Sequence, residues 1–216
     1  MDFILLDELK ELTAWEWALA ALCLLAFIGM ILALIFLPRK EKKALSTRTL
    51  IIGAMCVSLS FVLSYIKLWS MPMGGSITLA SMLPLMLFAN RFGLKCGLLA
   101  GLAYGILQFI QKPEIYHWAQ MLIDYPLAFT LIGLAGLTRQ MQLGCVIGGL
   151  ARFICHFLTG FLFFASYAPE GMNAVWYSFI YNGSYMGVDI LICILLSFPV
   201  CAILDRRKIG GASNAN

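Results

Sequence analysis

The chain has 216 residues, of which 62% are hydrophobic and only 12% are charged, and its mean hydropathy is +0.89. Soluble domains are usually about 45–50% apolar and about 25% charged, so this composition excludes a water-soluble globular fold. Seven spans of about 20 residues, each able to cross a ~30 Å hydrocarbon core, fit in this length with short loops and little else. There is no room for an ATPase or another aqueous catalytic domain, so any powered work depends on a partner.

The apolar runs follow one another as expected for membrane-spanning helices. They cover residues 14–37, 49–68, 77–90, 92–111, 117–138, 143–165 and 177–204. The first run has an acidic start and no small-residue cleavage site, so we predict a retained transmembrane helix and not a secretory signal. The 77–90 run is short and contains Pro84, so we expect it to tilt, to break or to be shielded by its neighbours.

Basic and aromatic residues gather on opposite sides of these spans. Eleven of the 15 lysine and arginine residues fall in alternate loops on one side, namely Arg39, Lys40, Lys42, Lys43, Arg48, Arg91, Lys95, Arg139, Arg206, Arg207 and Lys208. Basic loops stay in the cytoplasm, so we predict an outside N-terminus and a cytoplasmic C-terminus. All five tryptophans and eight tyrosines map to the outer half. An interfacial belt explains part of this, but belts form at both interfaces, so we predict an aromatic-lined pocket that opens outward.

Four ionisable residues lie well inside predicted spans, and these are Asp124, Arg152, His156 and Asp189. Each would be costly against lipid, so we expect a pocket, a pathway or a buried pair. Arg152, His156 and Gly160 are spaced four residues apart and share one helix face. A lone intramembrane histidine is as readily structural as functional. Polar groups at matching depth on three helices favour a binding site, and one carboxylate among aromatic faces suits a flat cation.

The surroundings of two of these residues give further expectations. Pro126 removes one backbone hydrogen bond, which should loosen the helix beside Asp124. Arg152 and Asp189 reach a similar depth, about 18–20 Å from the outer helix ends. We therefore predict a buried, bidentate ion pair between them at the pocket floor. In the alternatives, Arg152 extends to the cytoplasmic interface or stays free for a phosphate on the ligand.

Small residues in the spans indicate packing more than chemistry. Glycines at positions 93, 97, 101 and 105 form one face of the fourth span, which predicts close helix packing. The seven cysteines are scattered through apolar runs without a CxxC pair, and there are only two histidines. This pattern favours neither a disulfide framework nor a metal site, so we expect no metal.

Several motifs together resemble a known family. They are residues 74–84, residues 120–129, Arg152-x3-His156-x3-Gly160, residues 167–171 and Tyr177-Ser178-x3-Asn182-Gly183. The sequence is similar here to the thiamine-specific substrate-binding (S) component of energy-coupling factor (ECF) vitamin transporters. The resemblance implies an all-α integral membrane protein with a six-helix core at 49–205, preceded by one extra transmembrane helix at 14–37. The remaining segments are then an extracellular segment 1–13, a basic cytoplasmic linker 38–48 and a cytoplasmic tail 206–216.

The resemblance also implies a function and a set of site residues. The chain would bind thiamine from outside, without enzymatic activity or cofactor, and a transmembrane coupling subunit with two ABC ATPases would drive uptake. No nucleic-acid partner is implied. By position, the ligand-binding residues are Asp124, Tyr125, Arg152, His156, Gly160, Phe164, Tyr177 and Asn182. Ala54 and Ser58 stand where the family carries an Ala-x3-Ala surface for the coupling subunit. Ser58 departs from that pattern, and Phe164 stands where tryptophan can occur.

Other functions stay open at this point. The fold permits several ligands, so the chain could be an S component for a different vitamin. A different class is an intramembrane enzyme that uses Asp124 and His156 for acid–base chemistry, but no serine or cysteine nucleophile accompanies them. An ion pathway could follow the same residues through Arg152 and Asp189. Polar residues concentrate toward the outer half of the spans, which argues against a path through the membrane.

Overall fold

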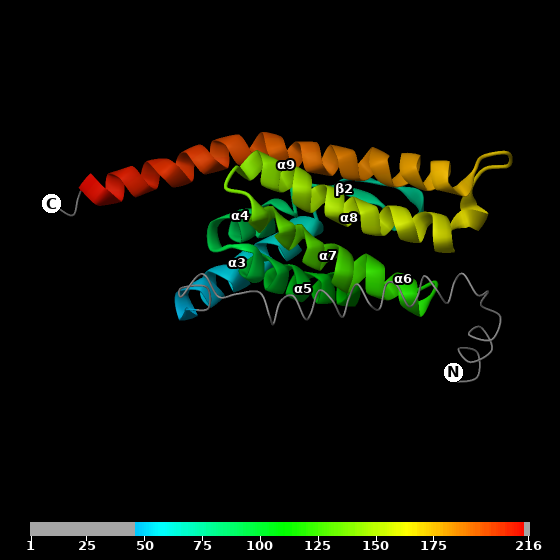
Figure 1. Cartoon of the computed structure of the whole chain (residues 1–216), viewed down its shortest axis with the longest axis horizontal. Coiled ribbons are helices and arrows are strands. Elements are labelled where there is room, and N and C mark those ends of the chain that lie inside the picture. Colours follow the sequence, from blue (N-terminus) through cyan, green and yellow to red (C-terminus); the bar gives the residue numbers. More distant parts are fainter. Residues whose placement is uncertain (1–45, 214–216) are drawn as a thin grey trace. The chain divides into compact units, whose positions relative to one another are not determined.

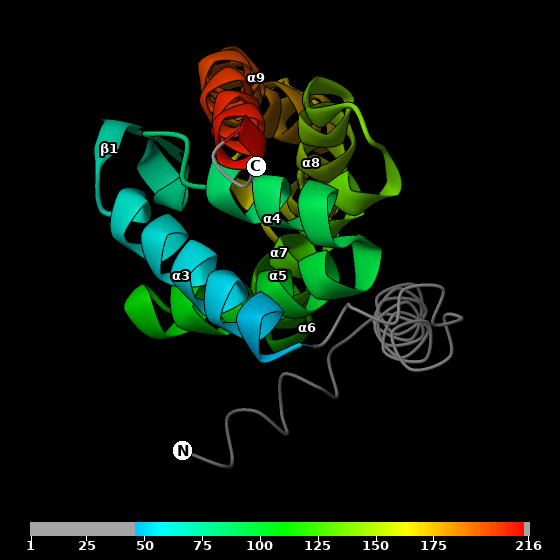
Figure 2. The same cartoon turned by 90° about the vertical axis from the view of Figure 1, so that its left-hand side faces the viewer.

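The computed structural model describes residues 46–213, with side chains described for residues 46–72 and 74–205. The predicted extra helix at 14–37, the segment 1–13 and most of the linker 38–48 lie outside the described residues. The elements are α3 (Thr47–Ser64), β1 (Lys67–Ser70), η1 (Pro72–Gly74), β2 (Ser76–Thr78), α4 (Leu83–Phe92), α5 (Leu94–Gln111), α6 (Trp118–Leu122), η2 (Ile123–Leu127), α7 (Ala128–Leu131), η3 (Ile132–Leu137), α8 (Met141–Phe163), η4 (Ala165–Tyr167) and α9 (Ala174–Ser213). The fold is that of an all-helical membrane protein with one small hairpin (Figure 1, Figure 2).

Within the described residues, five helices are long and apolar enough to cross a membrane. They are Thr47–Ser64, Leu94–Gln111, Trp118–Leu137, Met141–Phe163 and Ala174–Asp205. Each lies within a predicted apolar run or extends it by a few residues. We call Trp118–Leu137 the broken helix, because it changes from α-helix to π-helix, back to α-helix and finally to a 3-10 helix.

The run at 77–90, expected to tilt, to break or to be shielded by its neighbours, breaks into a strand and a short buried helix. Ser76–Thr78 forms β2, which pairs antiparallel with β1, and α4 starts only at Leu83. Pro84 lies in the first turn of α4, where proline is favoured, whereas inside a longer helix it would break the backbone ladder. The ten residues of α4 are too few to cross a membrane. Most of its side chains are buried, so α4 fills the interior of the bundle.

The same strand pairing shortens the run predicted at 49–68. Here α3 ends at Ser64, and Lys67–Ser70 turns back as β1. We call residues 67–78, which contain β1, η1 and β2, the hairpin. Gly74 has φ +88° in this turn, a left-handed conformation that glycine adopts without strain. The hairpin lies against α9, which β2 contacts (Figure 1).

Close packing of α5 on the broken helix confirms the role predicted for the glycine stripe. A Cβ at Gly101 would overlap the carbonyl oxygen of Phe129, and one at Gly97 would overlap Ala89 and lie against the backbone of Gly133. The backbones therefore approach to a distance that only glycine allows. This contact fixes the height and rotation of the broken helix against its neighbour.

The glycine contact gives a stability prediction. Gly101→Val should lower the free energy of unfolding by about 1–3 kcal/mol, because the added side chain overpacks a filled interface. Gly187 on α9 has no atom within 4 Å of the position that a Cβ would take. The control Gly187→Ala should therefore melt at or slightly above the wild-type temperature. Thermal unfolding in detergent, followed by circular dichroism, compares the variants, and an unchanged melting temperature for Gly101→Val would contradict the packing.

Candidate functional site

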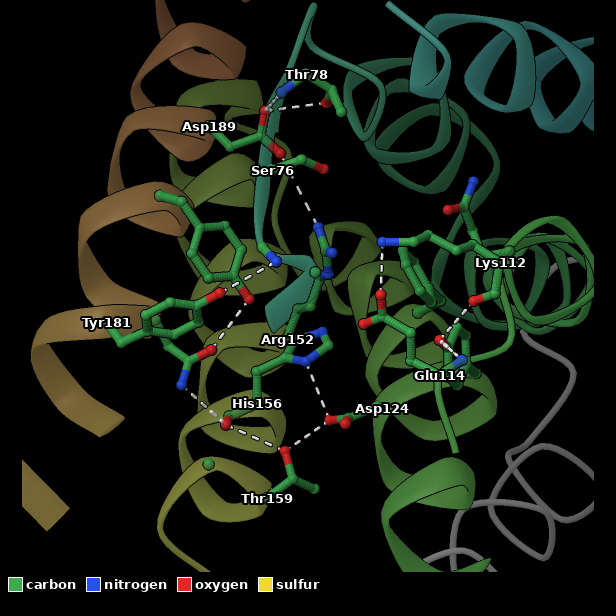
Figure 3. Close-up of a pocket in the computed structure, with 18 of the residues that line it drawn as sticks. Ser76, Thr78, Lys112, Glu114, Asp124, Arg152, His156, Thr159, Tyr181 and Asp189 are labelled. Carbon is green, nitrogen blue, oxygen red and sulfur yellow. Dashed lines mark hydrogen bonds and ion pairs between the residues drawn. The ribbon is translucent and has the colours of Figure 1, made fainter. Parts of the chain in front are cut away.

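One cavity lies among α5, the broken helix, α8, α9 and the hairpin (Figure 3). Its wall contains all eight residues that the sequence predicts as ligand-binding, which are Asp124, Tyr125, Arg152, His156, Gly160, Phe164, Tyr177 and Asn182. They come from the broken helix, the α8 region and α9, which are far apart in the sequence. The fold thus gathers the predicted residues at one place, while their contact with a ligand stays a prediction.

Asp124 lies on a turn of π-helix within the broken helix. This turn covers Ile123–Leu127 and contains Pro126, so the loosened helix predicted beside the carboxylate is confirmed. Proline removes one backbone hydrogen bond, which favours such a local change of winding. Single π-helical turns are frequent at functional sites. The residue is only 8% exposed, so its carboxylate is nearly removed from solvent.

Three donors hold the Asp124 carboxylate. Gln120 Nε2 donates to Oδ2 at 2.7 Å, and the Thr159 hydroxyl donates to Oδ1 at 2.7 Å. His156 Nδ1 lies 3.0 Å from the same Oδ1. Figure 3 shows the contacts of His156 and Thr159 from α8 to Asp124. A carboxylate has about four acceptor positions, so Oδ2, with one described donor, has room for another.

Gln120 and Thr159 are site residues that sequence reasoning missed. Gln120 precedes Asp124 by four residues, and Thr159 follows His156 by three. Residues at these spacings are neighbours on a helix surface, and a Gln–Asp hydrogen bond is one of the pairs that this spacing favours. The spacing was therefore an available signal, although neutral polar residues are common enough in helices to make it weak.

Two buried nitrogen atoms on the cavity wall lack a partner among the described residues. They are His156 Nε2, on the far side of the ring from Asp124, and Arg152 Nε. Buried polar atoms are nearly always hydrogen-bonded, to protein or to ordered water. Each of these two nitrogen atoms therefore has unused hydrogen-bonding capacity close to the cavity.

The contact between Arg152 and Asp189 differs from the predicted bidentate pair. Arg152 Nη1 is 4.0 Å from Asp189 Oδ2, a single long contact. The other carboxylate oxygen, Oδ1, accepts hydrogen bonds from the Thr78 amide at 3.2 Å and the Thr78 hydroxyl at 3.1 Å. Arg152 also lies 4.5 Å above the Phe129 ring and donates to the Met82 sulfur. The predicted bidentate geometry is wrong, because Thr78 of the hairpin already binds one of the two carboxylate oxygens of Asp189.

Close contact between α8 and α9 forms another side of the cavity. A Cβ at Gly160 would overlap the Ser178 hydroxyl, so glycine allows the two helices to approach. Asn182 Nδ2 donates to the backbone oxygens of His156 at 3.1 Å and Ser178 at 3.0 Å. Its Oδ1 accepts a bond from the Tyr185 hydroxyl at 3.0 Å. The amide of Asn182 thus links α9 to α8 behind the cavity surface.

Tyr125 fixes the loop between α5 and the broken helix. Its hydroxyl donates to the Lys112 carbonyl oxygen at 2.7 Å and accepts from the Glu114 amide at 2.9 Å. Its ring contacts Phe109 edge-on at 5.3 Å between centroids. Both hydrogen-bonding directions of the hydroxyl are used inside the protein. Tyr125 therefore offers its ring, more than its hydroxyl, to the cavity.

Aromatic rings cluster at the end of the cavity near η4. Phe164 packs edge-on against Tyr116 at 4.7 Å between ring centroids and lies 6.1 Å from Tyr167. The hydroxyls of Tyr116 and Tyr167 are hydrogen-bonded. This bond raises the pKa of Tyr116 above its ordinary value, because it stabilises the protonated hydroxyl. The cluster holds the Phe164 ring at the cavity wall, as an aromatic stacking position requires.

The hairpin supplies cavity residues that the sequence did not single out. Gly74, Gly75, Ser76 and Thr78 all line the cavity. The Tyr181 hydroxyl on α9 binds the hairpin twice, because it accepts from the Gly75 amide and donates to the backbone oxygen of residue 72. The apolar run was expected to begin at residue 77 and residues 74–76 to lie in the loop before it. The family motif at 74–84 contains these residues, but no ligand-binding role was predicted for them.

A family model described as "Thiamine transporter protein (Thia_YuaJ)" matches residues 50–208 of the chain. The chain belongs to the thiamine transporter protein family. This membership confirms the resemblance found in the sequence motifs. Because the family consists of transporters, the prediction that the chain is not an enzyme is also confirmed. With five apolar helices among its described residues, this member of the family is a multi-pass membrane protein.

Individual relatives agree with the family. The thiamine transporter ThiT of Bacillus subtilis (strain 168) is 34% identical over 145 residues, which cover 59% of this chain and 75% of that protein. ThiT of Lacticaseibacillus paracasei is 34% identical over 123 residues, or 47% of this chain and 61% of that protein. A solved structure of ThiT from Listeria monocytogenes superposes with a TM-score of 0.63 at 28% identity. The superposed region covers 68% of this chain and 90% of the solved chain.

The side chains of this cavity are suited to binding a ligand. The cavity offers one carboxylate with capacity for a further donor, an imidazole nitrogen without a partner, and several aromatic rings. Within residues 46–213, no three His, Cys, Asp or Glu side chains cluster closely enough to hold a metal ion. A flat ligand with amino hydrogens and a positive charge matches this set of groups.

The hydrogen bond from Thr159 gives a second prediction. Thr159→Val removes the hydroxyl with little change of shape, and should lower the free energy of unfolding by about 1.5–3 kcal/mol, as for hydrogen bonds to charged groups. Thr159→Ser keeps the hydroxyl and is the matched control, which should lose less. Thermal unfolding in detergent without ligand measures both. Equal losses for the two variants would show that the methyl group matters and the bond to Asp124 does not.

Proposed function

We propose that this protein is the membrane-embedded, thiamine-binding S component of an ECF-type ABC importer. It captures thiamine from outside the cell and depends on partner subunits for ATP-driven uptake. The family and its thiamine transporters support the ligand. The observation that carries the proposal is the buried Asp124 carboxylate, held by three donors in a cavity with aromatic walls.

The chemistry of thiamine complements this cavity. Its aminopyrimidine ring carries an amino group whose two hydrogens can be donated to acceptors such as Asp124 Oδ2. Its thiazolium ring is flat and carries one positive charge, so it stacks on Phe164 and is stabilised by the nearby carboxylate. Phenylalanine has a weaker cation–π face than tryptophan, which leaves a larger share of the recognition to Asp124.

The orientation in the membrane follows from the basic residues. We place the cytoplasm on the side of Arg48, Arg91, Lys95 and Arg139, and the cavity toward the outside. Arg91 at the end of α4 pairs with Asp205 late in α9 at 3.1 Å. The basic end of α4 therefore lies beside the later turns of α9, whereas the cavity is lined by the earlier turns. This arrangement supports a cytoplasmic C-terminus, and the outside N-terminus depends on the predicted span at 14–37, which lies outside the described residues.

The partner surface that we propose is the exposed face of α3. Ala54 and Ser58 are both exposed there and are one helical turn apart. Small side chains at this spacing let a second helix approach closely. A transmembrane coupling subunit with two ABC ATPases is the partner, since the described part of the chain contains no ATPase fold of its own.

The site proposal predicts the effect of removing one charge. Asp124→Asn should weaken thiamine binding by about 1–3 kcal/mol, as expected for the loss of a charge-assisted contact. Titration of thiamine against intrinsic tryptophan fluorescence of the purified protein measures this. Asp205→Asn makes the same substitution at an exposed ion pair away from the cavity, and should bind like the wild type. Unchanged affinity in folded Asp124→Asn would remove Asp124 from the site.

The docking proposal predicts a separation of binding from transport. Replacing both Ala54 and Ser58 with leucine should abolish thiamine uptake by cells, because the bulky side chains keep a partner helix away. Thiamine binding by the isolated protein should persist. Ala202→Leu enlarges another exposed alanine, on α9, and should leave uptake intact. Uptake that survives the double leucine variant would place the docking surface elsewhere.

A further inference from the structure

We propose that Asp189 is a specificity-determining residue that neutralises Arg152 within the cavity. Asp124 then has no arginine or lysine partner among the described lining residues, and its ionisable neighbour is His156 at 3.0 Å. A cavity with one net negative charge favours a ligand with one positive charge over a neutral ligand of the same shape. This inference rests on the proposed thiamine-binding function and names the residues that set the charge preference of the site.

The buried charges of the cavity are few and can be counted. Asp124 is 8% and Asp189 is 2% exposed, and the side chain of Arg152 is 14% exposed. The remaining charged lining residues are Lys67, which is exposed, and the ion pair Lys112–Glu114. Exposed charges are screened by water and salt, whereas buried ones are screened much less. The two buried carboxylates and one guanidinium therefore dominate the field in the cavity.

His156 is the other ionisable residue beside the ligand position, and its Nδ1 lies 3.0 Å from Asp124 Oδ1. It is present in every variant compared below, so its charge enters both sides of each comparison. The change in charge preference between variants therefore depends on Asp189 and Arg152, with Asp124 as the fixed acidic group.

The geometry assigns Asp189 to Arg152. Among the described residues, Asp189 is the carboxylate within ion-pair distance of the guanidinium, at 4.0 Å. The other contacts of Arg152 are the Phe129 ring and the Met82 sulfur, neither of which carries a negative charge. The two hydrogen bonds from Thr78 hold Asp189 Oδ1, which leaves Oδ2 directed to the guanidinium. Asp189 is therefore positioned from two sides.

Without this carboxylate, the cavity would lose its attraction for a cation. The charge of Arg152 would then offset that of Asp124, and the cavity would be more positive by one unit than in the wild type. Charge–charge interactions are stronger at any given distance where the effective dielectric constant is low. The loss would act on the charged ring of thiamine and would leave a neutral ring of the same shape almost unaffected.

The test compares two ligands on one set of variants. Thiamine is titrated beside a neutral isostere in which the thiazolium nitrogen is replaced by carbon. The readout is the ratio of their dissociation constants on the purified full chain. Asp189→Asn should reduce the preference for thiamine about tenfold or more, by the loss of one opposing charge. Arg152→Gln should increase the preference, and the double variant should return it toward the wild-type ratio.

Two control variants separate an effect of charge on the ratio from an effect of altered structure. Thr78→Val removes one hydrogen bond to Asp189 without changing any charge, so both ligands should lose affinity equally and the ratio should hold. Asp189→Glu keeps the charge and should keep most of the ratio. If Asp189→Asn does not fold, the ratios of Arg152→Gln and Asp189→Glu decide the same question.

The experiment distinguishes failure of this inference from failure of the proposed function. Equal affinity losses for both ligands in Asp189→Asn, or an unchanged ratio in Arg152→Gln, would overturn the inference and reduce Asp189 to a structural anchor of the hairpin. Failure of the wild-type protein to bind thiamine would instead overturn the proposed function. The wild-type titration is therefore run first in every series.

Discussion

A buried carboxylate among membrane helices determines much of this structure. Asp124 would be costly against lipid, so it has to be satisfied from within the bundle. Gln120 supplies one donor from its own helix, and Thr159 and His156 supply two from α8. The same contacts tie the broken helix to α8. The residue that is suited to bind a cation is thus also the one that joins two walls of the cavity.

The other walls are held by backbone approach and by shared hydrogen bonds. Gly160 allows α9 to contact α8, and Asn182 bonds across the contact to the His156 carbonyl oxygen. Tyr181 and Asp189 then fix the hairpin to α9. Since these links connect α8, α9 and the hairpin, few cavity residues on these walls are free to rearrange. Pre-organised groups of this kind favour binding, because little ordering remains to be done when a ligand arrives.

The sequence predicted those parts of the site that are unusual in a membrane. An aspartate, a histidine and an arginine inside apolar runs are rare, so Asp124, His156 and Arg152 stand out from their neighbours in the sequence itself. The distortion at Pro126 was predictable because proline has no amide hydrogen. The spans of the longer helices followed from hydropathy alone, since each approaches the thickness of the hydrocarbon core.

The rest depended on contacts between distant residues. The run at 77–90 is apolar whether it forms a helix or a strand followed by a helix, so composition could not reveal β2. Thr78 lies 111 residues from Asp189, and nothing in either segment indicates that the hairpin takes one carboxylate oxygen. For this reason the predicted bidentate pair with Arg152 was wrong in geometry, although the two residues do face each other. Gln120 and Thr159 were missed because neutral polar residues carry little signal by themselves.

The central claim is that this chain alone binds one thiamine molecule at the cavity built around Asp124. Isothermal titration calorimetry of the purified wild-type protein in detergent tests it most directly, with riboflavin and biotin as comparison ligands. The account predicts saturable binding of one thiamine per chain, without ATP or partner subunits, and no binding of the other two vitamins. Absence of thiamine binding by folded protein, or equal binding of riboflavin, would contradict it.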